Sequence, residues 1–442
     1  MARNGDGAAQ TWPGGWRPWG LLAALLAAYV LAFVDRQVLN LLVEPIKRDL
    51  HLSDTQVSLL QGLAFALFLS AAGLPVGRLV DKRRRITLIA LGVGFWSLAT
   101  AACGLVRGYP QLLAARIGVA VGESVTPGAY SLIGDLFPPR RMGLAISLYQ
   151  AGPYLGGGLA LIGGAWLIAH TAGWSLGLPL FGELHGWRLV FLLIGLPGLL
   201  VALLVACLKE PARTGPSRAA APSPREVGRY FRANAGAILG LNLCTAAAAT
   251  MSYGFSAWAP SFLIRTFHMT PPQVGAAYGP IVILAGVAGS LSAGIAGDWA
   301  VARGFRVGRL GVMVAAVLCA LPCATAAALA GSAGAALMLI APTGYFTAVA
   351  LAGAPAALQD ITPPRMRGVQ HALGILAVNL VGLGSGPTAV ALVTDFVLHD
   401  EGRLRYALAT VAPAALAFSA LFGALAAPAY SSSRRRMVAD SA

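Results

Sequence analysis

Long apolar stretches separated by short polar segments dominate the chain. Twelve of these stretches are about 20 residues long or more, which is the length an α-helix needs to cross a bilayer. They cover residues 18–44, 55–80, 86–106, 110–137, 141–170, 187–208, 233–266, 272–298, 308–331, 334–359, 366–396 and 404–429. Strands of a membrane β-barrel would be about ten residues long and would alternate in polarity. The pattern therefore predicts an all-α membrane protein with twelve transmembrane helices.

The composition and the charge distribution support a membrane location. Of the 442 residues, 57% are hydrophobic and 11% are charged, whereas a soluble domain is about 25% charged. With the N-terminus placed in the cytoplasm, 23 of the 32 Lys and Arg residues fall on the cytoplasmic side, 7 on the opposite side and 2 within apolar stretches. This bias predicts a multi-pass protein of the cell inner (plasma) membrane with both termini cytoplasmic. We expect the basic clusters to contact anionic membrane lipids rather than nucleic acid.

Nothing in the sequence indicates a metal, a cofactor or enzymatic activity. The five cysteines lie in apolar stretches, and no His or acid accompanies them at ligand spacing, which is typical of small hydrophobic residues. The chain contains no HExxH, no GxxxxGK[ST] loop and no Ser/His/Asp combination at matching depth. We therefore expect a protein without cofactor or metal that is not an enzyme, and any transport it performs would be driven by an ion gradient.

The sequence contains an internal repeat, because segments of the first half recur in the second half. LHLSDTQV at 50–57 matches FHMTPPQV at 267–274, and DLFPPR at 135–140 matches DITPPR at 360–365. Two six-helix halves in the same orientation, joined by a polar linker, resemble the plan of major facilitator transporters. The expected division is a cytoplasmic N-terminal tail 1–17, an N-terminal bundle 18–208, a cytoplasmic linker 209–232, a C-terminal bundle 233–430 and a cytoplasmic tail 431–442. The Pro, Ser and Arg content of 213–225 predicts a flexible loop that needs no fold of its own.

Two further segments resemble signatures of the major facilitator superfamily. GRLVDKRRR at 77–85 resembles the segment between its helices 2 and 3, with Arg84 in place of the usual Gly. There Gly77 would let two helices approach closely, and Asp81, like its repeat Asp298, would latch one conformation of a bundle at a helix end. GPYLGG at 152–157 resembles the antiporter motif, which implies a bend and close packing across the halves. The candidate gating residues are Gly77, Asp81, Arg85, Asp135, Arg140, Gly152, Pro153, Gly156, Gly157, Asp298, Asp360 and Arg365.

Four ionisable residues lie at membrane depth: Asp35, Arg36, Arg116 and Glu123. Such a charge costs about 2.5–3.5 kcal/mol on insertion scales, so a chain that keeps four of them uses them. Arg116 and Glu123 share one helix face, and Asp35 is predicted at the depth of Arg116, where the two would pair. We expect Asp35, Arg116 and Glu123 to couple transport to protons through alternate pairing of Arg116. The structural alternative is a static ion network that only fixes helix packing.

These charges, with GES at 122–124, GWR at 186–188 and KEP at 209–211, resemble the spinster-type transporters, which are related to lysophospholipid and sphingosine-phosphate exporters. The charge pairs also resemble organic-anion symporters of the same superfamily. The second half supplies almost no charge, and a cavity that is charged on one side and apolar on the other suits an amphiphile.

We therefore expect a monomeric, proton-coupled transporter that works by alternating access and exports a lysolipid-like or other amphiphilic organic anion. The alternative is a proton symporter of a small organic anion, such as a sugar acid or carboxylate. For Arg36, two roles are open: binding an anionic group of the substrate or pointing at the outer surface. The candidate substrate contacts are Arg36, Arg116, Asn40, Tyr149, Tyr154, Tyr253 and Asn379.

Overall fold

The computed structural model describes residues 15–171, 173–179, 182–211 and 223–439. The helices of the N-terminal half are α1 (Arg17–Leu41), α2 (Val43–Leu50), α3 (Asp54–Gln61), α4 (Leu63–Lys82), α5 (Arg85–Cys103), α6 (Tyr109–Glu123), α7 (Pro127–Leu136), α8 (Pro139–Gln150), α9 (Gly152–Thr171), α10 (Trp187–Gly195) and α11 (Pro197–Ala206). Strands β1 (Ser175–Leu178) and β2 (Gly182–His185) form an antiparallel hairpin between α9 and α10.

The remaining helices follow the linker. They are α12 (Pro224–Ala233), α13 (Ala235–Phe267), α14 (Pro271–Ala302), α15 (Gly308–Leu329), α16 (Ala333–Asp360), η1 (Pro364–Met366), α17 (Arg367–Ala377), η2 (Val378–Leu383), α18 (Gly384–Leu392), η3 (Val393–Leu398), η4 (Glu401–Arg403) and α19 (Leu404–Ala439). The segments η2 and η3 are π-helical, whereas η1 and η4 are short 3₁₀-helices.

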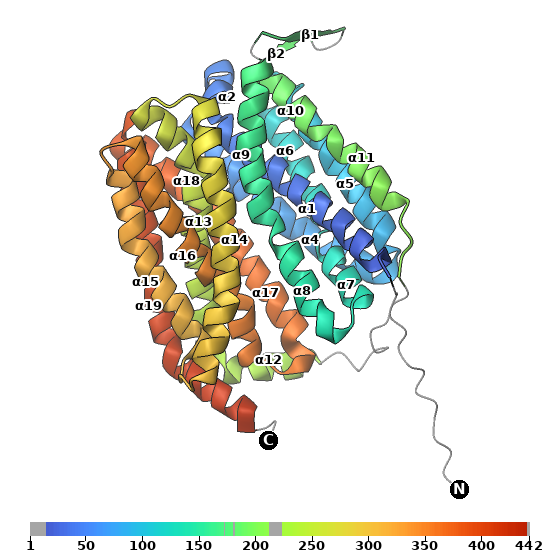
Figure 1. Cartoon of the computed structure of the whole chain (residues 1–442), viewed down its shortest axis with the longest axis vertical. Coiled ribbons are helices and arrows are strands. Elements are labelled where there is room, and N and C mark those ends of the chain that lie inside the picture. The colour runs from blue at the N-terminus through green and yellow to red at the C-terminus, as the bar shows by residue number, and fades with distance from the viewer. Residues whose placement is uncertain (1–14, 172, 180–181, 212–222, 440–442) are drawn as a thin grey trace.

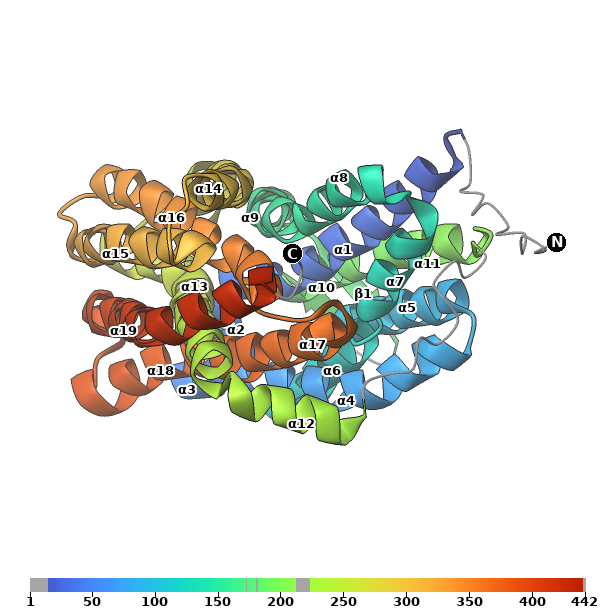
Figure 2. The same cartoon turned by 90° about the horizontal axis from the view of Figure 1, so that it is seen from below.

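The helices form two bundles that stand side by side, α1–α11 and α13–α19 (Figure 1). This arrangement confirms the predicted all-α membrane fold. Helices α9 and α14 pack against each other along the boundary, as both views show (Figures 1 and 2). Helix α1 begins and α19 ends at one end of the molecule, which we call the terminal end. The opposite end, which carries α2 and the hairpin, is the far end.

The fourth predicted span, 110–137, is broken into two short helices. Within the described residues, 11 helical segments are long and apolar enough to cross a membrane, and α6 and α7, with 15 and 10 residues, account for the twelfth apolar stretch. Pro127 has no N–H for the helix ladder. The hydroxyls of Ser124 and Thr126 donate to the main-chain oxygens of Val121 and Glu123 at 2.7 and 2.6 Å. The break therefore ends α6 at Glu123.

The repeated sequences form equivalent corners in the two halves. Helices α2 and α13 are each followed by a left-handed histidine, His51 with φ 51° and His268 with φ 56°. The next helices, α3 and α14, each begin with a reciprocal capping box. The matching sequences 50–57 and 267–274 thus form the same helix–turn–helix corner in each half.

Close helix packing falls at glycines other than Gly77. A Cβ built on Gly77 would meet no described atom within 4 Å, so the predicted close approach at this position is wrong for this conformation. A Cβ on Gly156 would lie 2.4 Å from the main-chain oxygen of Val30, and one on Gly158 would lie 2.7 Å from that of Gly279. Helix α9 therefore contacts α1 within its own half and α14 across the boundary through its glycines.

The linker holds a helix that the sequence analysis did not expect. Helix α12 begins inside the segment 213–225, because Ser223 and Glu226 form a capping box at its N-terminus. The signature Ser-x-x-Glu was visible in the sequence. At the other end of the chain, α19 continues to Ala439 and runs through most of the expected tail.

Substituting Gly156 by Ala should destabilise the protein, whereas substituting Gly163 on the same helix should not. The added methyl of Gly156→Ala overlaps main-chain atoms of α1, and such overpacking costs about 1–3 kcal/mol. A Cβ on Gly163 meets no described atom within 4 Å, so the higher helix propensity of Ala dominates there. The midpoint of thermal unfolding in detergent measures both variants, and equal midpoints would disprove the close contact.

Candidate functional site

The four membrane-depth charges lie together in the N-terminal half and form a buried centre. Asp35 and Arg36 are successive residues of α1, so their side chains leave the helix about 100° apart and face different neighbours. The Asp35 carboxylate, 2% exposed, accepts a hydrogen bond from Thr100 Oγ1 of α5 at 3.1 Å. Arg36 forms an ion pair with Glu123, the last residue of α6. The broken fourth span thus places a carboxylate opposite α1.

The predicted pair between the side chains of Asp35 and Arg116 is replaced by a different arrangement. Arg116 Nη1 donates to the main-chain oxygen of Asp35 at 3.4 Å, because the carboxylate is turned towards Thr100. The Arg116 guanidinium lies 5.1 Å from the ring centre of Phe65, and that of Arg36 lies 4.7 Å from the same ring. Arg36, whose side chain is 13% exposed, therefore faces the interior and not the outer surface. Both arginines therefore contact the same aromatic ring.

This centre has hydrogen-bonding capacity left over. The buried atoms without a partner among the described residues are Asp35 Oδ1, Arg36 Nε, Arg116 Nε and Nη2, and Glu123 Oε1. Leaving buried polar groups unpaired is costly, so such atoms are generally completed by water, an ion, a ligand or a proton. Two acids and two arginines sum to zero charge when all are ionised, so the centre can take a proton or an anionic group with little rearrangement.

Aromatic side chains cover the centre on the side of the terminal end. Tyr149 stacks on Tyr29 with ring centres 4.5 Å apart, and Tyr130 meets Tyr149 edge-on at 5.1 Å. The ring of Tyr130 lies 6.4 Å from that of His371 on α17, which belongs to the other half. Tyr149 was expected here, whereas Tyr29 and Tyr130 were not, because a tyrosine in an apolar stretch carries no signal of its own.

A small pocket adjoins this stack. Its lining is mostly apolar and comes from α1, α5, α8 and the break between α6 and α7. The lining residues are Leu25, Ala28, Tyr29, Ile89, Trp96, Val125, Thr126, Ala129 and Tyr149.

The other predicted substrate contacts lie in different surroundings. Asn40 accepts from Gln61 Nε2 at 2.9 Å and donates to the main-chain oxygen of Ser256 at 3.4 Å, which ties α1 and α3 to α13. Tyr154 packs against Gly286, where a Cβ would lie 2.1 Å from its ring, so it belongs to the contact between α9 and α14. Asn40 and Tyr154 thus lie at contacts between the halves.

Two predicted contacts belong to the C-terminal half. Tyr253 lies half-buried on α13, and Asn379 lies half-buried in the π-helical segment η2. A π-helical turn within an α-helix is frequently associated with a functional site.

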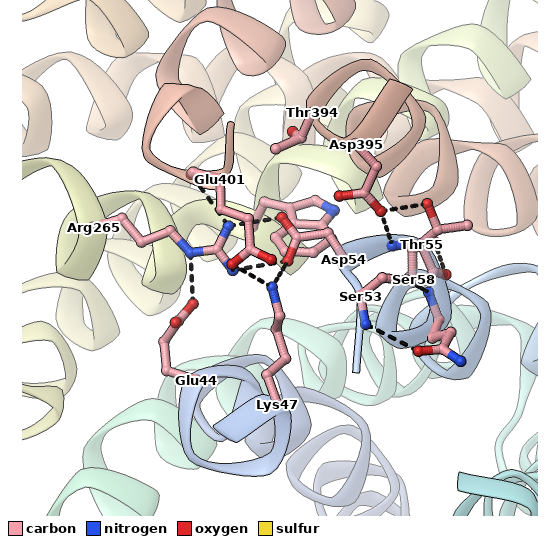
Figure 3. Close-up of polar contacts among 12 residues, drawn as sticks. Glu44, Lys47, Ser53, Asp54, Thr55, Ser58, Arg265, Thr394, Asp395 and Glu401 are labelled. Atoms are coloured by element: carbon pink, nitrogen blue, oxygen red, sulfur yellow. Dashed lines mark hydrogen bonds and ion pairs between the residues drawn. The ribbon is translucent and has the colours of Figure 1, made fainter. Parts of the chain in front are cut away.

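An ion-pair network joins the two halves at the far end (Figure 3). Arg265, at the end of α13, contacts Glu44 of α2 at 2.8 Å and Asp54 of α3 at 2.7 and 2.9 Å. Lys47 pairs with Asp54 and reaches Glu401 of η4 at 2.7 Å. The Asp54 side chain is 0% exposed, so its contacts with Arg265 and Lys47 are shielded from water, whereas the side chain of Glu401 is 54% exposed.

A second contact completes this closure. The main-chain N–H and the hydroxyl of Thr55 donate to Asp395 of η3 at 2.7 and 2.6 Å, so a carboxylate of one half caps a helix of the other (Figure 3). Sequence reasoning missed the whole network because its residues lie in short polar segments between spans. The repeat offset of 217 aligns Arg265 with Arg48, which was the available signal.

At the terminal end, the described clusters hold each half together. Arg85 pairs with Asp135 and contacts Glu210 at 3.1 Å. Arg309, which is 224 residues after Arg85, bridges Asp298 and Asp360 at 2.5 Å each. The two halves therefore each hold an arginine–aspartate pair at this end. Arg309 was missed because its offset from Arg85 equals neither offset of the repeated segments, 217 or 225.

Several candidate gating residues sit beside these clusters. Tyr430 donates to Asp360 at 2.8 Å and secures α19 to α16. Arg365 is exposed on η1. The side chains of Asp81 and Arg140 lie outside the described residues, so the latch expected at Asp81 stays a prediction.

Comparison with known proteins identifies the family. Residues 25–387 match the model of the Major Facilitator Superfamily. The chain belongs to this superfamily. It is similar to an MFS-type efflux pump of Mycolicibacterium smegmatis, with 29% identity over 387 residues that cover 87% of this chain and 86% of the relative. It is also similar to the protein spinster of Drosophila melanogaster, with 23% identity over 282 residues, 61% of this chain and 44% of the relative.

A solved structure supports the spinster resemblance. A bacterial homologue of the human lysosomal transporter spinster, in an inward-facing and unoccupied conformation, superposes with a TM-score of 0.77 at 27% identity, covering 97% of this chain and 99% of that one. The major facilitator fold and the spinster resemblance predicted from the sequence are therefore confirmed. This major facilitator protein is a multi-pass membrane transporter.

Replacing Arg265 by Gln should open the far end. The substitution leaves Glu44 and Asp54 without their shared cation, and removing one partner of a buried pair costs about 3–5 kcal/mol. Hydrogen exchange of the main chain at 54–61 should become faster than in the wild type. The exposed repeat counterpart Arg48 gives the matched control, and Arg48→Gln should exchange like the wild type. Unchanged exchange in Arg265→Gln would show that the network does not hold the halves.

Proposed function

We propose that this major facilitator protein is a proton-coupled transporter that exports an amphiphilic organic anion by alternating access. The observation that carries the proposal is the buried centre of Asp35, Arg36, Arg116 and Glu123, which is charge-balanced yet has unpaired donors and acceptors. A network that only fixes helix packing is expected to pair most of its buried polar atoms with protein groups or water. The similarity to an efflux pump over 87% of the chain supports export.

The acids are the proposed proton sites. Asp35 has one hydrogen-bonding partner, Thr100, and one unpaired oxygen, so it can take a proton without breaking an ion pair. Glu123 must release Arg36 to do so. Protonation of Glu123 would free Arg36. Protonation of Asp35 would remove its negative charge beside Arg116, which we propose as the group that changes partners.

The arginines and the tyrosine stack are the proposed substrate contacts. The two unpaired N–H groups of Arg116 suit an anionic head. The apolar body of the substrate would lie against Tyr149 and Tyr29, with Tyr253 and Asn379 facing it from the other half. Asn40 and Tyr154 would act on the contact between the halves more than on the substrate, since both are held there.

The conformation fits a state that loads at the terminal end. In the described part of the chain, the pairs of Lys47 with Glu401 and of Arg265 with Glu44 and Asp54 join the halves, and all of them lie at the far end. With the predicted cytoplasmic termini, the substrate would enter from the cytoplasm. The glycine contacts of α9 with α14 are the proposed pivot between the bundles.

Export is consistent with the electrostatics of the membrane. The centre carrying a bound monoanion has one net negative charge, and the empty centre carrying a proton has one net positive charge. An inside-negative potential drives the first outward and the second inward, at about 2.3 kcal/mol per charge and 100 mV. Exchange of an internal anion for an external proton would therefore be electrogenic and strongly driven.

Charge balance also supports a second function, proton symport of an organic anion. The centre is neutral when it is empty and when it holds both a proton and an anion. In both forms the protein can pass through its closed conformation without the cost of a buried net charge. Such a cycle would be electroneutral, which separates it from exchange.

The proposal is tested in two steps. A thermal-shift screen at pH 5.5 and pH 7.5 compares a short-chain lysophosphatidate with galactonate on the wild type and on Arg116→Ala. Stabilisation by the lysolipid that is lost in Arg116→Ala is expected, and stabilisation by galactonate alone would favour the small-anion symporter. The ligand is then added to proteoliposomes that enclose a pH dye. Exchange makes the lumen alkaline at a rate that responds to a potassium-diffusion potential, whereas symport makes it acidic.

Glu123→Gln should abolish ligand-driven proton movement in these proteoliposomes and leave folding intact. Gln cannot release a proton but retains the shape of the side chain, so ligand binding by thermal shift should persist. Glu183→Gln removes an exposed glutamate of the hairpin and should behave like the wild type. If Glu123→Gln still moves protons at the wild-type rate, Glu123 is not a coupling residue.

A further inference from the structure

Helix α12 has two faces of different character. Its half-buried side carries Tyr230 and Phe231, which pack against the core of the C-terminal half at the terminal end. The hydroxyl of Tyr230 donates to the main-chain oxygen of Ile361. The helix is therefore fixed to the bundle by its apolar side and by one polar contact.

The opposite side of α12 is a stripe of arginines. Arg225, Arg229 and Arg232 are exposed, and spacings of four and three residues place them on one face of a helix. Glu226 is the single acid of α12. The Glu226 carboxylate accepts a hydrogen bond from the Ser223 main-chain N–H. This bond, together with the interaction with the Ser223 hydroxyl, lowers the pKa of Glu226. It is therefore ionised at neutral pH, and α12 carries a net charge of +2.

The position of α12 matches the surface of a membrane. The helix ends at Ala233, and the membrane helix α13 begins at Ala235. Both views show α12 lying across the terminal end, at the margin of the molecule (Figures 1 and 2). The single residue between the two helices keeps α12 at the end of this span.

We infer that the arginine stripe of α12 binds the headgroups of anionic phospholipids. Basic residues beside a transmembrane helix are attracted to anionic lipid, and an amphipathic helix held in the plane of the interface presents them together. The inference rests on charge complementarity and on the continuity of α12 with a membrane span. It does not depend on which substrate is transported.

The proposed lipid site on α12 is connected to the candidate gating residue Asp360. Tyr230 holds the main chain at Ile361, and the preceding Asp360 accepts from Arg309 and Tyr430. A lipid that fixes α12 therefore also fixes the neighbour of this cluster. We expect anionic lipid to stabilise the arrangement of α15, α16 and α19 seen here.

The experiment compares Arg229→Gln/Arg232→Gln with the control Arg303→Gln/Arg306→Gln. The control removes two exposed arginines from the loop between α14 and α15, so both variants lose the same charge. Each full-length protein is titrated in uncharged detergent with phosphatidylglycerol, phosphatidylcholine or inorganic phosphate. Bound lipid is counted by native mass spectrometry, and the thermal midpoint is recorded in parallel.

The wild type and the control should bind phosphatidylglycerol and gain thermal stability from it. The α12 variant should bind it about thirtyfold more weakly, because each basic residue near an anionic surface contributes about a fivefold gain in affinity. Equal midpoints of all three proteins in phosphatidylcholine show that folding is intact. Equal phosphatidylglycerol binding by the α12 variant and the control would overturn the inference, as would an equal stabilisation by inorganic phosphate.

Discussion

The need to balance charge inside a low-dielectric membrane governs this molecule. Two carboxylates and two guanidinium groups lie within one half, and their sum is neutral. Much of the surrounding structure serves this balance. The break after Glu123 ends α6 where a carboxylate can meet α1, Asp35 bonds to Thr100 and not to the side chain of Arg116, and both cations contact the ring of Phe65. The centre is therefore neutral when all four groups are ionised, and it keeps donors and acceptors without a partner among the described residues.

Charge also organises the two ends of the bundles, in opposite ways. At the far end, Arg265 and Lys47 contact acids of the other half. At the terminal end, Arg85 and Arg309 contact acids of their own half and make each bundle rigid there. Between the ends, α9 and α14 touch through glycines without charge. Contacts of backbone against backbone resist compression but not a small rotation, which is what a pivot between rigid bundles requires.

The fold could be predicted from the amino-acid sequence because hydrophobicity, repeats and buried charges are properties of single positions or of fixed spacings. The sequence predicted that Asp35, Arg36, Arg116 and Glu123 lie at membrane depth in the first half, but not which of them pair. Which of these residues pair depends on the rotation of α1 about its axis and on the residue at which α6 ends. A change of a fraction of a helical turn would give different partners. The contact expected at Gly77 failed because a glycine shows that a close approach is tolerated, not that a neighbour is present. The far-end network crosses between halves more than 200 residues apart, a distance that no local pattern reports.

The way Arg265 is shared has a kinetic consequence. One guanidinium serves carboxylates on two separate helices, and the more deeply buried of these, Asp54, is held by Lys47 as well. Loosening Arg265 leaves the buried Asp54 carboxylate with Lys47 alone and Glu44 without its cation, so partly separated arrangements lose charge compensation inside the protein and are high in energy. The far end should therefore part in one concerted event, with long dwell times and scarcely populated intermediates. In single-molecule records such a gate would switch abruptly between two levels and would not drift between them.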